Sequence, residues 1–126
     1  MNRMLRNTAL LACCVATGLG ANAALAATCA PADATLAGHY YLEGVSEVGS
    51  EILLRPDGSF DYMLAYGAED HLAKGCWSHH GEQVSLLSTG SAGSAQAFKQ
   101  LDLKARADHG LVADMGNGVM GTYLAH

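Results

Sequence analysis

Apolar and polar residues alternate along most of this chain, in short stretches separated by turn-forming residues. In the clearest stretch, from Phe60 to Tyr66, every second residue is aromatic or aliphatic, and Asp61 is among the residues between them. A period of two places successive side chains on opposite faces of an extended strand. The turn signals include Asn117-Gly118, because Asn-Gly tolerates the positive φ angles of a tight hairpin. Alternation and turns together predict an all-β domain.

We predict about eight short strands in this pattern, over residues 38–44, 51–55, 60–66, 73–78, 83–87, 101–106, 111–115 and 119–124. A single helical turn is expected at residues 33–36, and residues 88–96, rich in Ser, Gly and Ala, form a surface connection. Short turns between successive strands favour a small antiparallel up-and-down meander that closes into a barrel and so leaves no exposed edge. A two-sheet sandwich with the same strand order is the alternative.

The first 27 residues have a different composition. Arg3 and Arg6 precede an apolar run over residues 9–19, and small residues follow at Ala24 and Ala26. This order is typical of a secretory signal peptide. We therefore expect a signal peptide at residues 1–26 and one β-barrel domain at residues 27–126, in a bacterial protein that is periplasmic or secreted. A lipoprotein signal ending at Cys13 is the rival interpretation, but the apolar run before that cysteine is too short.

Cleavage at this point would leave two cysteines, Cys29 and Cys76. In an oxidising compartment an even number of cysteines predicts a disulfide. Two separate buried thiols are the alternative. No C-x-x-C spacing is present, which argues against a catalytic or zinc-binding thiol pair.

Part of the sequence resembles a known type of protein. The residues that carry the resemblance lie between positions 36 and 87 and include Gly38-His39-Tyr40, Asp57-Gly58-Ser59-Phe60, Gly75-Cys76-Trp77 and Val84-Ser85-Leu86. They are similar to those of small secreted bacterial proteins of the lipocalin-like β-barrel type. Lipocalins carry their Gly-x-Trp motif near the N-terminus, whereas it lies in mid-chain here. The resemblance implies a barrel and carries over no functional residue.

Charge limits the classes of partner. Without Arg3 and Arg6, the twelve acidic residues face only five basic ones, which gives a net charge of about −7. Such an excess of acid argues against nucleic acid as a partner, because phosphate binding requires basic surface. No later stretch is long and apolar enough to predict a membrane span in the mature chain. No motif calls for a cofactor.

Six histidines raise the alternative of a periplasmic protein that binds copper or zinc. His79 and His80 are the candidate ligands, although adjacent residues on a strand point to opposite faces. A hydrolase is a weaker hypothesis. Gly90-Ser91-Ala92-Gly93 lacks the G-x-S-x-G spacing of a nucleophile elbow, so no catalytic residue is predicted.

The function that we predict is therefore that of an exported, non-enzymatic binding or protein-interaction module, whose partner is a protein or a small-molecule ligand. Packing and turns do not account for the acidic residues Glu47, Glu69 and Asp70, the last two of which we place in a polar connection that follows Tyr66. In a meander, the connections after the first and third strands open at the same end. We expect these carboxylates to form an acidic rim beside Tyr66 that binds a cationic partner.

Overall fold

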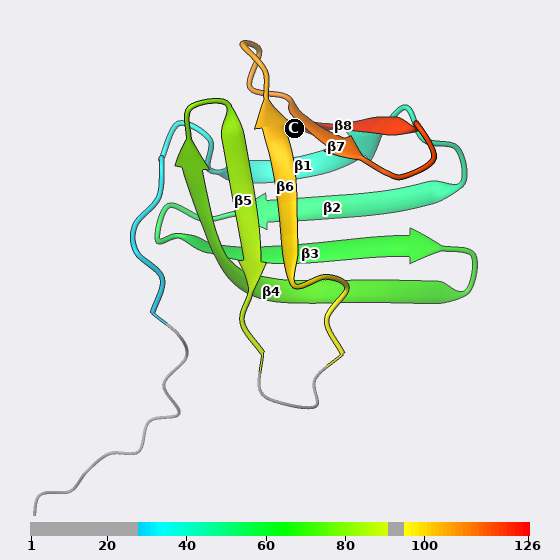
Figure 1. Ribbon diagram of the computed structural model, residues 1–126, viewed down its shortest axis with the longest axis horizontal. Helices are drawn as coiled ribbons and strands as arrows, with labels where there is room; N and C mark the ends of the chain where they lie inside the picture. The colour runs from blue at the N-terminus through cyan, green and yellow to red at the C-terminus, as the bar shows by residue number, and fades with distance from the viewer. Residues whose placement is uncertain (1–27, 91–94) are drawn as a thin grey trace, which may run out of the picture.

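The structure is a computed structural model that describes residues 28–90 and 95–126. The predicted signal peptide lies outside the described residues, and so do four residues of the connection predicted at 88–96. Figure 1 shows the strands, which are β1 (Gly38–Glu43), β2 (Val48–Leu54), β3 (Ser59–Tyr66), β4 (Glu69–His80), β5 (Gln83–Ser88), β6 (Gln100–Ala105), β7 (Leu111–Asp114) and β8 (Met120–Ala125).

These strands form one closed barrel in which they follow one another in chain order. Every neighbouring pair is antiparallel, and β1 closes the barrel by pairing with β8. The predicted eight-stranded antiparallel barrel is confirmed. Within the two described stretches, no helix is long and apolar enough to cross a membrane.

Two strands begin three or more residues earlier than the alternation predicts. β2 starts at Val48 and β4 at Glu69, because tight turns with positive φ angles at Glu47 and Gly67 precede them. The prediction that Glu69, Asp70 and His71 lie in a connection is wrong, since these residues pair with the end of β3. Polar residues occupy strand positions here because this part of β4 is exposed on both faces.

β4 changes its pairing along its length. Its first part, Glu69 to Cys76, pairs with β3, whereas the part from Gly75 to His80 pairs with β5. A Cβ atom at Gly75 would lie 2.0 Å from the carbonyl oxygen of Leu87. A glycine is therefore required where β5 approaches β4.

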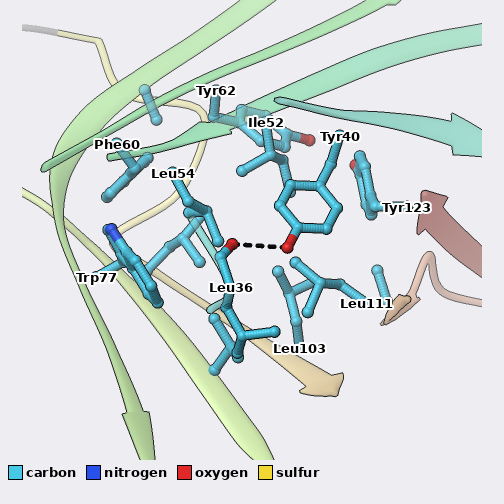
Figure 2. Packing of buried hydrophobic residues seen from close by; sticks show 14 residues of the cluster. Leu36, Tyr40, Ile52, Leu54, Phe60, Tyr62, Trp77, Leu103, Leu111 and Tyr123 are labelled. Carbon is cyan, nitrogen blue, oxygen red and sulfur yellow. Dashed lines mark hydrogen bonds between the residues drawn. The ribbon is translucent and has the colours of Figure 1, made fainter. Parts of the chain in front are cut away.

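The barrel interior is filled by inward-facing side chains, many of them aromatic (Figure 2). Alternation along β3 buries Phe60 and Tyr62, and Trp77 on β4 lies in the same cluster. The largest fully buried side chains are Tyr40, Tyr123, Phe60, Ile52, Leu54, Leu86, Leu111 and Val84. Removing this apolar area from water is the main source of stability for such a domain.

One polar contact lies within this apolar interior. The buried Ser50 hydroxyl donates to the carbonyl oxygen of Met63 at 2.6 Å and lies 2.8 Å from the Tyr123 hydroxyl. Burial raises the pKa of Tyr123, so the phenol stays protonated. The contact satisfies both hydroxyls, which would otherwise be costly to bury.

Residues 28–37, which we call the strap, run along the end of the barrel opposite the β1–β2 turn, where Ala32 bonds to Pro56 of the β2–β3 turn (Figure 1). Leu36 of the strap is 4% exposed and lies within the core cluster, where its carbonyl oxygen accepts a hydrogen bond from the Tyr40 hydroxyl at 2.6 Å (Figure 2). The predicted Cys29–Cys76 disulfide is present, with 5.4 Å between the Cα atoms. The strap is therefore held by a covalent bond at one end and by a buried leucine near the other.

A contact between Asp33 and His79 holds the middle of the strap. Asp33 Oδ2 lies 3.0 Å from His79 Nδ1, and Asp33 Oδ1 accepts hydrogen bonds from the hydroxyl and the backbone N–H of Thr35. The two Thr35 hydrogen bonds, and after them the one from His79, lower the pKa of Asp33 from 3.8 to about 2. These bonds favour the charged form of the carboxyl.

This lowered pKa predicts a pH dependence of stability. Because the folded-state pKa of Asp33 is about 2 and the reference value is 3.8, its contribution is fully present above pH 4 and is lost as the pH falls through 2. Asp33→Asn should remove this part of the acid dependence of unfolding, as measured by urea titration at several pH values. In an NMR titration, Thr35→Ala should raise the pKa of the Asp33 carboxyl. An unchanged value would contradict the assignment of Thr35 as the main cause.

Candidate functional site

Three hairpin connections lie together at one end of the barrel, on the right in Figure 1. They join β1 to β2, β3 to β4 and β7 to β8. We call these connections and the strand residues that flank them, 43–48, 66–70 and 114–120, the acidic end. Its carboxylates are all on exposed residues: Glu43, Glu47, Glu69, Asp70 and Asp114. None of the three segments contains a lysine or an arginine.

Strand register places the predicted rim residues at this end. Tyr66, the last residue of β3, pairs with Val48 on one side and with Glu69 on the other. Glu47 directly precedes Val48, and Asp70 pairs with Ala65. Since neighbouring strands are about 4.8 Å apart, the backbones of Glu47, Tyr66 and Glu69 lie within about 10 Å of one another.

The carboxylates occupy both faces of the sheet. Glu69 and Asp70 are consecutive residues of β4, so their side chains point to opposite faces. Glu69 Oε2 lies 3.4 Å from Nε2 of His71, which is on the same face. The acidic end therefore offers negative charge on both sides of the barrel wall.

Exposed apolar side chains accompany these carboxylates. Tyr66 is 55% exposed, Val119 is 45% exposed and Met120 is 55% exposed. Val119 and Met120 were not predicted as site residues, although two apolar residues directly after the Gly116-Asn117-Gly118 turn indicate an exposed apolar pair. Exposed aromatic and methionine side chains ringed by charge are typical of surfaces that bind other proteins.

Two further carboxylates of the first hairpin, those of Glu43 and Glu51, contact histidine side chains. Glu51 lies further along β2, where its Oε2 atom is 3.3 Å from His39 Nε2. Glu43 Oε1 lies 3.4 Å from Nε2 of His126. Glu51 therefore does not belong to the acidic end, and Glu43 is partly balanced when His126 is protonated.

The two histidines proposed as metal ligands are separated. His79 is half-buried and contacts Asp33, whereas His80 is exposed and pairs with Gln83 at the end of β4. Across residues 28–90 and 95–126, no group of three or more His, Cys, Asp or Glu residues has the geometry to hold a metal ion.

A shallow groove of about 280 Å³ crosses the outer face of β1 to β4. Its apolar floor includes Leu53, Met63 and Leu72, and its polar wall includes Glu51 and Asp61. Both carboxylates have cationic or titratable partners, His39 for Glu51 and Arg55 for Asp61. Lys74 also lines the groove, which is therefore close to electrically balanced and favours a positively charged ligand less than the acidic end does.

Comparisons with family models, with curated proteins and with solved structures each find no match for this chain.

Proposed function

We propose that this protein is an exported, non-enzymatic interaction module that binds a cationic protein through its acidic end. The observation that supports the proposal best is the segregation of charge. Five exposed carboxylates and three exposed apolar side chains lie in segments that contain no lysine or arginine.

Two physical effects support binding at this end. A surface with one sign of charge attracts an oppositely charged partner and raises the rate of association. The apolar side chains of Tyr66, Val119 and Met120 then supply area that a partner can bury. Neither effect requires a cavity, and the aromatic interior of the barrel is already filled.

Export belongs to the same proposal. A disulfide is stable in the periplasm or outside the cell and is rare in the reducing cytosol. The Cys29–Cys76 bridge is therefore consistent with removal of residues 1–26 during secretion. The resemblance to secreted lipocalin-like barrels supports the same location.

The proposal predicts that three neutralising substitutions abolish capture of the partner. The variant Glu47→Gln/Glu69→Gln/Asp70→Asn should recover at least tenfold less of a cationic protein from periplasmic extract than the unchanged protein does, because each lost charge weakens the attraction. Recovery by the unchanged protein should also fall as salt rises, since exposed charges are screened beyond about 10 Å at 0.1 M ionic strength.

A matched control neutralises three exposed carboxylates outside the acidic end, Asp57→Asn/Glu82→Gln/Asp108→Asn. This variant has the same net charge as the test variant and should capture the partner as well as the unchanged protein. Equal losses in the two variants would indicate a general effect of net charge. Equal recovery by the test variant and the unchanged protein would place the function elsewhere.

A further inference from the structure

β6 and β7 are paired over only a short length. Their register comprises Lys104 opposite Val112 and Ala105 opposite Leu111. β6 begins at Gln100, and β7 continues to Asp114. In Figure 1 the two strands meet near the β6–β7 connection and then diverge, with β7 running toward the acidic end.

The backbone of β6 therefore has an open side. Lys99 accepts a hydrogen bond from the Ser88 N–H at 2.9 Å, and the Ala105 N–H donates to the Glu82 carbonyl oxygen at 2.6 Å. Backbone groups alternate in direction along a strand, so those of Gln100 and Asp102 point away from β5. In the part of the chain that the structure describes, no strand pairs with this side of Gln100 or Asp102.

The side chains along this edge alternate in chemistry. Leu101 and Leu103 face the interior, whereas Asp102 is exposed on the outer face. Asp102 Oδ1 accepts hydrogen bonds from Gln100 Nε2 at 2.9 Å and from Ser85 Oγ at 2.8 Å. These bonds lower the pKa of Asp102 and keep it charged.

β7, the next strand after β6, carries a second exposed acidic residue. Asp114, the last residue of β7, is exposed. The Met115 N–H bonds to the Val119 carbonyl oxygen on the β8 side, so the backbone groups of Asp114 point in the opposite direction, toward β6. Among the described residues, the facing sides of Gln100 and Asp102 on β6 and of Asp114 on β7 thus have no strand partner, and each strand carries an exposed aspartate there.

We propose that an extended segment of the partner protein adds to the edge of β6 as an antiparallel strand, opposite Gln100 and Asp102. A lysine or arginine at the start of that segment lies directly opposite Asp102, and the residue after it is apolar and faces the same side as Leu101. Strand addition supplies main-chain hydrogen bonds, and the opposite-charge pair sets the register. The inference rests on the proposed function and specifies its partner as a basic, extended segment.

A second copy of this chain fits the edge less well. Antiparallel pairing of two β6 strands centred on Asp102 places two aspartates directly opposite each other, which is destabilising. A lysine or arginine at that position gives attraction instead, so charge complementarity favours a different protein.

The probe is a blocked pentapeptide, acetyl-Lys-Leu-Val-Leu-Val-amide, whose lysine lies opposite Asp102 and whose later residues run along β6 away from the part paired with β7. It is titrated into ¹⁵N-labelled protein and followed by NMR. The amide signals of Gln100 and Asp102 should shift and exchange more slowly with solvent. A peptide methylated at the lysine backbone nitrogen should bind at least tenfold more weakly, because that N–H points toward β6 in the antiparallel pairing. Methylation of both leucine nitrogens, which point away, should leave binding within about twofold.

The same peptide tests the contribution of the Asp102 charge to binding. Asp102→Lys should weaken binding about tenfold, because the lost attraction and the new repulsion together amount to about 1.4 kcal/mol. Replacing the peptide lysine with glutamate should restore binding to this variant. Asp108→Asn, a change at an exposed aspartate in the β6–β7 connection, is the control and should have no effect.

Three results would overturn the inference: equal binding by both methylated peptides, absence of shifts at Gln100 and Asp102, or a dimer without peptide in which these amides are already protected. The two proposals can fail separately. If the Glu47, Glu69 and Asp70 variant loses its partner but the peptide does not bind β6, only the proposed strand addition at β6 is wrong. If the peptide binds but that variant keeps its partner, the proposal that the acidic end binds the partner is wrong.

Discussion

Replacing Cys29 and Cys76 with serine is expected to lower the free energy of unfolding by about 4 kcal/mol. The bridge joins residues 47 positions apart, and a cross-link over a loop of this length restricts the unfolded chain by roughly that amount in the chain-entropy model. A domain of this size has only about 5–15 kcal/mol of net stability, so the loss is large. Urea unfolding of the double variant and of the unchanged protein gives the difference directly.

The position of the disulfide also predicts which part of the protein becomes less protected when the bridge is removed. Cys29 lies at the start of the strap, and Ala32 donates a backbone hydrogen bond to Pro56 at 3.1 Å. In the variant, the amides of residues 28–35 should exchange faster with solvent, whereas those of β2 and β3 should keep their order of protection. A change in stability below about 1 kcal/mol would show that the strap and the core hold the fold without the bridge.

The second large effect is expected at Gly75. Substitution by alanine should destabilise the protein by about 3 kcal/mol or prevent folding, because the new Cβ would lie 2.0 Å from the Leu87 carbonyl oxygen and 2.8 Å from the Thr89 backbone nitrogen. Both obstructing atoms belong to the backbone, so β4 and β5 would have to separate. Urea unfolding, or the yield of folded protein, measures the effect.

Gly49 provides a matched control. It also lies in a strand, but among the described residues no atom beyond its own chain neighbours is within 4 Å of the position of an added Cβ. Gly49→Ala should therefore change the free energy of unfolding by no more than about 0.5 kcal/mol. Equal effects of the two substitutions would mean that strand propensity, rather than the close approach of β5, decides the outcome at Gly75.

The two ends of the barrel have different surroundings. At one end the strap covers the core with Leu36 and is fixed by the disulfide and by the Asp33–His79 hydrogen bond. At the other end, the acidic end has short hairpin connections, exposed carboxylates and exposed apolar side chains. A rigid scaffold that displays variable connections is a common way to build a binding surface. This division supports the placement of the function away from the strap.

Local sequence was sufficient for the fold class. Alternation along residues such as Phe60 and Tyr62, and turns at glycines such as Gly58 and Gly118, are properties of neighbouring residues. They predicted the eight strands and their chain order, and the two cysteines left after the expected cleavage predicted the Cys29–Cys76 bridge. Because short turns leave little freedom in strand order, this local information was enough to predict the barrel.

Other features depended on contacts between distant parts of the chain. Tyr62 and Tyr66 share one alternation pattern, yet Tyr62 is buried and Tyr66 is exposed. Tyr62 is covered in part by Phe98, from the segment before β6, and the centroids of the two rings are 4.8 Å apart. The start of β4 at Glu69 and the need for glycine at position 75 likewise follow from pairing with β3 and β5. Sequence specifies which face of a strand is apolar. Only tertiary structure decides how much of that face is covered, because the covering residues are distant in the chain.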